Sequence, residues 1–348
     1  MEVTFMSGYS EIIRNTILDL PCQKIFVAHE LKKEQFSELS EAVYYKTLER
    51  MVKQHQLVHL AKGLYYRPMM TANDIVPIPE DAIVDYYVSN NNGTLIGEGL
   101  FIEKGIASGF EKRLTLLSNR LSENKKKIGS IEVHRTEIEL TEQTIPVIEV
   151  LEILQNYYKI RNINKREFIA YIHDFVDEYS DEVTEYVLSK CKYKKSTIAF
   201  LARILDWYGL AHSMHEYLSP LSNYKIPTIE ELRLEIPEDI QNYLISYTNG
   251  IKEIYKDHLQ EVILYGSYAK GNYGYDSDID IMIIVDLPDE EIKKYRHAIS
   301  GYTYDINTEY DIDIKSMTKN KDLFSKWEHV YPFYKNVRLE GIHFYDAA

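Results

Sequence analysis

Two short apolar runs that flank a glycine-rich turn are the feature that most constrains the fold of this 348-residue chain. The first run is Glu261–Tyr265 and the second is Asp278–Val285, and both are rich in the β-branched and apolar residues typical of strands. Gly266–Gly271 and a polar loop lie between them. The pattern predicts a strand, a turn with a short helix, a loop and a second strand.

The turn between these runs has the residues expected of a phosphate-binding site. Gly266 ends the first strand at a point where the backbone can approach a ligand closely. The amides from Ser267 onward begin the helix, and their N–H groups have no intrahelical partner. Free donors and the helix dipole both favour an anion such as a triphosphate. Lys270 lies inside the turn and could reach a phosphate as a point charge.

Two carboxylates begin the second strand, after ten intervening residues that follow Ser267. Asp278 and Asp280 are two positions apart, so they project from the same face of a strand. Carboxylates beside bound phosphates are typical ligands of Mg²⁺. A pair of metal ions about 3.5 to 4 Å apart needs a further carboxylate from a neighbouring strand.

The stretch Tyr310–Met317 alternates acidic or polar residues with apolar ones and predicts that neighbouring strand. Asp311 and Asp313 would share one face of it. We expect Asp313, which lies between two isoleucines, to be the third carboxylate, with Asp311 as the alternative.

The glycine–serine turn, the Asp278-Ile-Asp280 strand and the later aspartate resemble the minimal nucleotidyltransferases of the DNA polymerase β superfamily. The resemblance covers residues 237–348. It implies transfer of a nucleoside monophosphate from an NTP with release of pyrophosphate, and two Mg²⁺ ions held by Asp278, Asp280 and Asp313. Gly266 and Ser267 would hold the β and γ phosphates.

Two other interpretations of this motif stay open. The acidic residues could merely face solvent, or the domain could bind a nucleotide without turnover. The presence of all three aspartates argues against a degenerate domain.

Residues 1–70 predict a winged helix-turn-helix. A helix over Tyr9–Leu20 is followed by a short strand at Ile25–Val27 and a brief polar helix. Ser40 can cap the next helix, Glu41–Gln54, and a hairpin with Gly63 at its tip follows. In such a domain the third helix enters the major groove and the hairpin contacts the DNA backbone.

The candidate DNA contacts are basic residues of the third helix and the hairpin, namely Lys46, Arg50, Lys53, Lys62 and Arg67. Residues 1–70 hold nine Lys and Arg against eight Asp and Glu, whereas the whole chain has a net charge of −14. The segment is therefore relatively basic, and promoter DNA is a candidate partner. The alternative is a winged helix that packs on another protein or on its own neighbour.

Leu60–Tyr66 and the preceding helix also resemble the N-terminal domain of AbiEi-type antitoxins. These are transcriptional regulators of a toxin–antitoxin class whose toxin is a nucleotidyltransferase. The resemblance extends into residues 71–218, which predict a mixed α/β and helical region. It implies a cognate toxin or antitoxin as partner and transfers no catalytic residue. Residues 219–236 contain Pro220 and Pro227 among polar residues and are followed by Pro237, so they predict a linker.

Composition sets the remaining expectations. The chain is 45% hydrophobic and 12% aromatic, enough for real cores, and we expect an α+β multidomain protein. His212 and His215 could suggest a metal, but they lack a third convergent ligand in the sequence. Neither a signal peptide nor a membrane span is indicated, and two lone cysteines suggest reduced thiols, so the expected compartment is the cytoplasm.

The sequence therefore predicts a Mg²⁺-dependent nucleotidyltransferase that modifies a protein or an RNA such as tRNA, in a toxin–antitoxin or phage-defence setting. The alternative is a DNA-binding antitoxin whose C-terminal domain binds a nucleotide or a toxin without catalysis. Neither the NTP nor the acceptor is specified by these residues.

Overall fold

The computed structural model describes residues 2–71, 74–109 and 113–347, so residues 72–73 and 110–112 of the expected middle region lie outside the described residues. The chain divides into two compact units. The N-terminal unit comprises residues 1–103, 109–157 and 182–192, and the C-terminal unit comprises residues 104–108, 158–181 and 193–348. Each unit is described by itself below.

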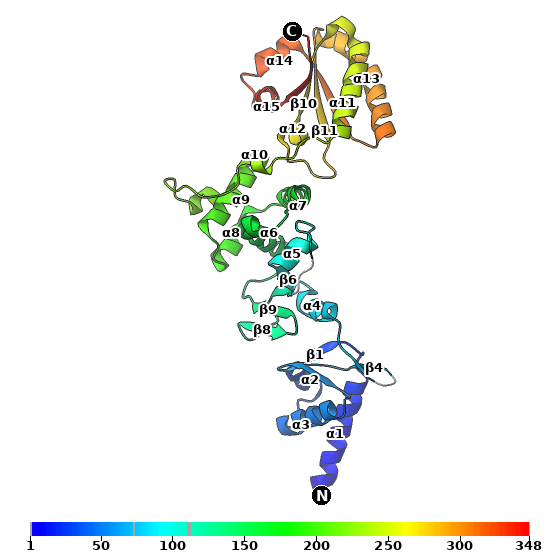
Figure 1. Ribbon diagram of the computed structural model, residues 1–348, viewed down its shortest axis with the longest axis vertical. Coiled ribbons are helices and arrows are strands. Elements are labelled where there is room, and N and C mark those ends of the chain that lie inside the picture. Colours follow the sequence, from blue (N-terminus) through cyan, green and yellow to red (C-terminus); the bar gives the residue numbers. More distant parts are fainter. Residues whose placement is uncertain (1, 72–73, 110–112, 348) are drawn as a thin grey trace. The chain divides into compact units, whose positions relative to one another are not determined.

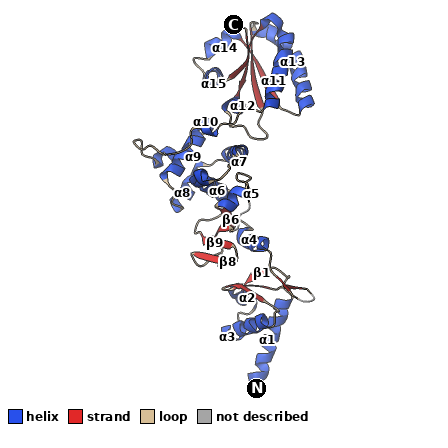
Figure 2. Ribbon diagram, viewed as in Figure 1, coloured by secondary structure: helices blue, strands red, loops and turns tan. Residues whose placement is uncertain are grey.

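The N-terminal unit contains short helices and small sheets (Figures 1 and 2). Its helices are α1 (Glu2–Leu18), α2 (Ala28–Gln35), α3 (Glu41–Lys53), α4 (Glu80–Val88), α5 (Glu98–Glu103), α6 (Thr144–Asn156) and α8 (Asp181–Lys190). Its strands are β1 (Ile25–Val27), β2 (Val58–Ala61), β3 (Leu64–Tyr66), β4 (Met69–Met70), β5 (Ile75–Val76), β6 (Gly93–Ile96), β7 (Thr115–Ser118), β8 (Lys125–Ile128) and β9 (Ile131–Arg135).

The first part of this unit has three helices beside a three-stranded sheet of order β1-β3-β2. Ser40 accepts a hydrogen bond from the Val43 N–H and caps α3, as the sequence predicted. Gly63 has φ +77° at the tip of the antiparallel β2–β3 hairpin. The core of this part is formed by buried residues of α1, α2 and α3, among them Ile13, Leu48 and Met51.

A four-stranded sheet of order β6-β7-β9-β8 follows in the same unit. The lysine run at 125–127 forms the edge strand β8 and pairs antiparallel with β9. Ile128 ends this strand and is buried opposite Ile131. Lysine is common on edge strands, where its charge discourages pairing with another chain.

The C-terminal unit combines a helical part with a sheet domain. Its helices are α7 (Lys165–Asp177), α9 (Lys195–Tyr208), α10 (Ile229–Leu232), α11 (Glu238–Tyr255), α12 (Gly266–Lys270), α13 (Asp289–Tyr310), α14 (Lys321–Trp327) and α15 (Pro332–Glu340). Its strands are β10 (Leu259–Tyr265), β11 (Ile279–Val285), β12 (Ile314–Asn320) and β13 (Ile342–Asp346). Three 3₁₀ turns are η1 (Tyr157–Lys159), η2 (Met214–Tyr217) and η3 (Lys256–His258).

The four strands of this unit form a mixed sheet of order β12-β11-β10-β13. β10 pairs antiparallel with β11 and β13, whereas β11 and β12 run parallel. Alternate residues of the central strands enter two cores: Val262 and Ile281 pack with α11 and α13, and Ile263 and Met282 pack with Phe324 of α14. Figure 1 shows α11 and α13 on one face and α14 and α15 on the other.

The end of α13 differs from the sequence expectation. The helix continues to Tyr310, and Asp311 follows as its C-cap in the left-handed conformation, with φ 54°. The strand begins only at Ile314. The prediction of a strand from residue 310, with Asp311 and Asp313 on a shared face, was therefore wrong, because the alternation begins in a helix cap.

The stretch expected to be a linker contains α10 and makes ordered contacts with the sheet domain. Leu232 is fully buried, and the Leu234 N–H donates to the Gly271 carbonyl. None of the described helices combines the length and the apolar character that a membrane span requires.

Candidate active site

The strand pair β10–β11 brings the glycine turn against one of the predicted carboxylates. Tyr265 is the register partner of Asp280, and Gly266 follows Tyr265 directly. Gly266 has φ +74°, and a Cβ built on it would lie 2.2 Å from Asp280 Oδ2. The carboxylate of Asp280 therefore occupies the space that any other residue at position 266 would need.

The short helix α12 carries the other predicted phosphate-binding residues. Ser267 is half-buried, and its carbonyl accepts the N–H groups of Gly271 and Asn272. Gly271 ends the helix with φ +74° and lies against the Leu234 carbonyl. The Lys270 ammonium lies 3.4 Å from Glu340 of α15, so in this structure its charge is paired at the side of the turn.

The two aspartates at the start of β11 differ in environment. Asp278 directly precedes the strand and is exposed, whereas Asp280 lies within it and is half-buried. Burial first, and then the negative charge of Asp278, raise the pKa of Asp280 above the ordinary aspartate value, and Lys315 offsets part of this effect. A partly desolvated carboxylate beside a second carboxylate is an environment that favours a bound cation.

Asp313 lies beside these two residues because β11 and β12 run parallel. Its carbonyl accepts the Ile279 N–H at 2.8 Å, and its carboxylate Oδ2 lies 2.8 Å from the Lys315 ammonium. The hydrogen bond with Asp313 is the main cause that raises the pKa of Lys315, and the charges of Asp278 and Asp280 add to it. All three carboxylates therefore act on one ammonium group.

Lys315 was not recognised in the sequence as part of this cluster. Its signal was its place two residues after Asp313, on the same face of the strand. The carboxylate of Asp313 is therefore paired with the ammonium of Lys315 in this structure.

Two sets of three metal-type ligands have their ligand atoms within 4.8 Å of one another in the described part of the chain, and Asp278, Asp280 and Asp313 do not form such a set. In the first, Asp206 is the third group that the sequence did not reveal beside His212 and His215. His212 Nδ1 accepts the Met214 N–H, which leaves Nε2 of the neutral ring to donate to Asp206. Hydrogen bonding therefore accounts for this set.

The second set is Glu261, His343 and Asp346. Arg338 binds both carboxylate oxygens of Glu261, at 2.7 and 3.2 Å. A bidentate guanidinium already neutralises this carboxylate, so the set is an ion-pair cluster rather than a cation site.

A helix far away in the sequence holds the loop between Gly271 and Asp278. The Arg166 guanidinium of α7 lies 4.6 Å from the ring centroids of both Tyr273 and Tyr275. Tyr273 in turn stacks on Tyr268 of α12, with centroids 4.1 Å apart. A continuous stack of planar groups thus joins α7 to the glycine turn.

Two further contacts hold the same loop. His173 Nε2 of α7 lies 3.3 Å from Ser277 Oγ, and Tyr208 of α9 donates its hydroxyl to the Asn272 carbonyl. Asn272 is 3% exposed. These contacts join residues that are far apart in the sequence, and no local pattern predicted them.

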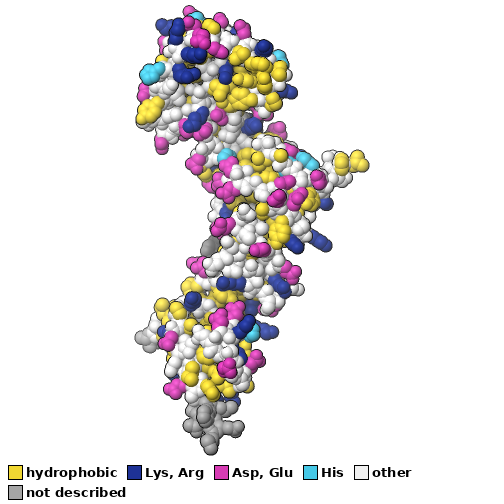
Figure 3. Space-filling model, turned by 180° about the vertical axis from the view of Figure 1, so that it is seen from behind, with side chains coloured by type: hydrophobic (Ala, Val, Ile, Leu, Met, Phe, Trp, Pro, Cys, Tyr) yellow, Lys and Arg dark blue, Asp and Glu magenta, His cyan; other side chains and the backbone are white. Residues whose placement is uncertain are grey.

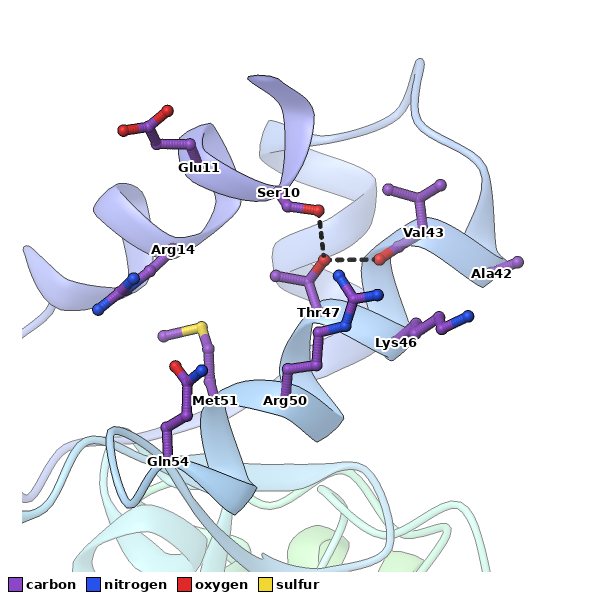
Figure 4. Close-up of a pocket in the computed structure, with 10 residues that line it drawn as sticks. All are labelled: Ser10, Glu11, Arg14, Ala42, Val43, Lys46, Thr47, Arg50, Met51 and Gln54. Atoms are coloured by element: carbon purple, nitrogen blue, oxygen red, sulfur yellow. Dashed lines mark hydrogen bonds between the residues drawn. The ribbon is translucent and has the colours of Figure 1, made fainter. Parts of the chain in front are cut away.

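The candidate DNA contacts lie in the N-terminal unit. Lys46 and Arg50 of α3 and Arg14 of α1 line a groove of about 690 Å³ between the two helices (Figure 4). Lys53 forms an exposed ion pair with Glu49 at 2.8 Å. On the face that Figure 3 shows, Lys and Arg side chains are interspersed with Asp and Glu side chains.

The two hairpin candidates differ from each other. Lys62 follows β2, and its carbonyl accepts the Lys126 ammonium at 2.9 Å. The Arg67 guanidinium donates to the carbonyls of Leu18 and Leu20, at the end of α1. Arg67, which directly follows β3, therefore joins this strand to the end of α1.

Comparison with known proteins agrees with the geometry of the C-terminal sheet domain. Residues 246–339 match the nucleotidyltransferase domain family. A relative from Methanocaldococcus jannaschii that bears the name protein adenylyltransferase is 31% identical over 99 residues, which are 27% of this chain and 87% of the relative. The chain belongs to the nucleotidyltransferase family. A second relative of the same name and organism is 34% identical over 87 residues, 24% of this chain and 84% of its own length.

A solved structure described as a toxin–antitoxin with AMP-PNP is 18% identical to the nucleotidyltransferase. It covers 31% of this chain and 73% of its own chain, with a TM-score of 0.21. A score this low adds nothing to the assignment.

Proposed function

We propose that this nucleotidyltransferase transfers a nucleoside monophosphate from an NTP to a hydroxyl of a protein or RNA acceptor. The observation that carries the proposal is the close approach of Asp280 to Gly266, with Asp278 and Asp313 acting on the same ammonium as Asp280. A phosphate bound at the turn would lie beside these carboxylates.

The carboxylates fit a divalent cation. Asp278 and Asp280 lie two positions apart at the start of β11, Asp280 is partly desolvated, and their mutual repulsion favours a positive charge between them. We assign Asp278, Asp280 and Asp313 as the residues that would hold two Mg²⁺ ions. Bound Mg²⁺ would neutralise phosphate charge and favour ionisation of the acceptor hydroxyl.

The turn would hold the phosphates of the NTP. The absence of a side chain at Gly266 lets the backbone approach the ligand, and the amide of Ser267 would donate to a phosphate oxygen. Lys270 would exchange Glu340 for a phosphate, since its ion pair is half-exposed and weak. Pyrophosphate would leave from this side of the site.

A protein hydroxyl and ATP are the acceptor and donor that the relatives' name, protein adenylyltransferase, favours. RNA, including tRNA, is the second acceptor class to be tested. We propose a toxin–antitoxin or phage-defence setting because residues 60–66 resemble AbiEi-type antitoxins.

The test combines labelled NTPs and Mg²⁺ with protein extract or with tRNA. The wild-type enzyme should label an acceptor and release pyrophosphate, and Asp278→Ala with Asp280→Ala should lose both activities. Asp305→Ala with Glu309→Ala removes the same charge from the exposed face of α13 and should remain active. Equal labelling by the wild type and the double aspartate variant would show that the transfer function is wrongly assigned.

We also propose that residues 1–70 are a winged helix that binds promoter DNA. The order of helices and strands and the β1-β3-β2 sheet support this proposal, with α3 as the recognition helix. Lys46, Arg50, Lys53 and Lys62 would contact phosphates or base edges.

A gel shift with upstream DNA tests this part. Arg50→Ala with Lys53→Ala should weaken binding and reduce its salt dependence. Lys32→Ala with Lys33→Ala removes two charges from α2 and should bind as the wild type does. Absence of any shift at low salt would contradict DNA binding and leave a protein partner for this domain.

A further inference from the structure

The edge strand β12 has backbone groups that point away from the sheet. Both the N–H and the C=O of Ile314 bind the side-chain amide of Asn307 on α13, at 2.9 and 3.2 Å. Asp313, by contrast, directs its carbonyl to β11. The direction of the backbone N–H and C=O groups alternates along a strand. Those of Ser316 and Thr318 therefore point away from β11, as those of Ile314 do.

The outward N–H and C=O groups of Ser316 and Thr318 have no backbone partner within the described residues 113–347. Asn307 shows what such a partner looks like, since its amide pairs with Ile314 as the peptide group of a neighbouring strand would. The next two positions present the same donors and acceptors without an amide to bind them. Their spacing along the strand is about 7 Å, which an extended polypeptide matches.

A groove of about 630 Å³ runs along this edge, between β12 and α13. Its lining includes every residue from Asp313 to Lys319, so the groove begins at the carboxylate cluster. Arg296 of α13, Lys315 and Lys319 are the cations in its lining, against one carboxylate, Asp313. The groove is therefore locally basic on a chain of net charge −14.

We propose that this groove binds the acceptor, and that the acceptor is an extended, acidic polypeptide segment that adds to β12 as a further strand. The proposal rests on the transfer function proposed above. Main-chain hydrogen bonds to Ser316 and Thr318 would supply affinity, and the three cations would select acidic side chains.

The geometry places the acceptor hydroxyl near the end of the added strand. Ser316 lies three residues from Asp313, which is roughly 10 Å of strand. The Ser, Thr or Tyr to be modified would thus lie about three residues beyond the first paired position, beside the carboxylates. Its oxygen would attack the α phosphorus, the bond to pyrophosphate would break, and the hydroxyl proton would pass to solvent or to a carboxylate.

A polypeptide fits this groove better than RNA does. Three cations in its lining are few for a phosphate backbone, whose binding depends on many such contacts. An unpaired strand edge, on the other hand, offers alternating donors and acceptors that a ribose–phosphate chain cannot pair with in register.

The first experiment uses labelled ATP with a random copolymer of glutamate and tyrosine, a copolymer of lysine and tyrosine, and total tRNA. Ser316→Pro removes an outward N–H at a place where edge strands accept proline. Ser316→Ala keeps that N–H and is the matched control. We expect the glutamate copolymer to be labelled in preference to the others, and Ser316→Pro to lower kcat/KM roughly fivefold or more. Nucleotide affinity should be equal in both variants.

The second experiment leaves the enzyme unchanged, which guards against misfolding of the proline variant. Two acidic peptides with a central tyrosine carry N-methyl groups on alternate residues, in the two possible sets. Because only alternate residues of an added strand face β12, one set should abolish labelling and the other should not.

Equal activity of Ser316→Pro and Ser316→Ala, indifference to both methylation sets, or labelling of tRNA in place of the copolymer would each overturn the inference. These results leave the transfer function intact, since an acceptor is still labelled. If the wild type labels nothing and releases no pyrophosphate, the transfer function fails, and this inference fails with it.

Discussion

The contact between Gly266 and Asp280 makes Gly266→Ala the sharpest test of the site. Position 266 has φ +74°, and a Cβ there would lie 2.2 Å from Asp280 Oδ2. Ordinary contact requires more than 3.4 Å. The carboxylate must therefore retreat by about 1 Å or more, and a displacement of that size at a reacting centre can cost about 100-fold in rate.

The same substitution has a second cost that is unrelated to catalysis. An alanine in the left-handed region costs about 1–2 kcal/mol, which lowers Tm by about 2–8 °C in a unit of this size. Gly209→Ala is the matched control, because Gly209 has φ +76° and no described atom lies within 4 Å of its Cβ position. The two variants should therefore share the loss in Tm.

The assay measures Tm by calorimetry and kcat from pyrophosphate release for wild type, Gly266→Ala and Gly209→Ala. We expect Gly209→Ala to be destabilised and active, and Gly266→Ala to be destabilised to a similar extent and nearly inactive. A Gly266→Ala enzyme with kcat within a few-fold of wild type would refute the role given to Asp280 against the turn.

Three further outcomes follow from single contacts. Arg166→Ala should raise KM for the NTP or lower kcat by about tenfold. Arg161→Ala, at an exposed position before α7, should change neither. Equal kinetics of the two variants would show that the stack does not position the loop. Lys315→Met should lower the Mg²⁺ concentration needed for half-maximal rate, because Asp313 loses a competing cation; a higher requirement would contradict this. Arg67→Ala should destabilise the N-terminal unit by about 1–3 kcal/mol in chemical denaturation. It should leave the salt dependence of DNA binding unchanged. A smaller salt dependence would indicate that Arg67 contacts a DNA phosphate.

The strand–turn–strand part of the site was predictable because its signals are local. Apolar runs of strand length, a glycine that must adopt positive φ and an Asp-x-Asp spacing together determine which side chains share a face. The structure pairs Tyr265 with Asp280 in that arrangement. The family match over residues 246–339 confirms the kind of domain that this pattern indicated.

The boundary at Tyr310 could not be predicted in the same way. Alternating acidic and apolar residues fit a strand, but tertiary contacts decide the outcome. Tyr310 stacks on Tyr243 of α11 at 4.3 Å, and Ile306 is buried one turn earlier, so the helix gains by continuing. Asp311 then adopts the left-handed conformation that aspartate tolerates at a helix end.

The loop contacts of Arg166, His173 and Tyr208 were also beyond sequence reasoning. They join residues that lie 64 or more positions away to the loop before Asp278, and a lone arginine on a helix carries no sign of its partner. Their effect is nevertheless large in physical terms. This loop would otherwise sample many conformations, and fixing it costs conformational entropy that these contacts offset.

Lys315 belongs both to the carboxylate cluster and to the lining of the groove along β12. Its ammonium cannot pair with Asp313 and with an acidic acceptor in the groove at the same time. Its ammonium lies 2.8 Å from Asp313 Oδ2, and Lys315 is also one of the residues that line the groove. A divalent cation held by Asp313 would repel this ammonium and direct it toward the groove, where it would meet an acidic acceptor. Lys315→Met separates the two effects: weaker competition at Asp313 should ease Mg²⁺ binding, while loss of a groove cation should raise KM for the glutamate–tyrosine copolymer. If Mg²⁺ dependence and acceptor KM both stay at wild-type values, Lys315 is only a surface ion pair of the kind that contributes little.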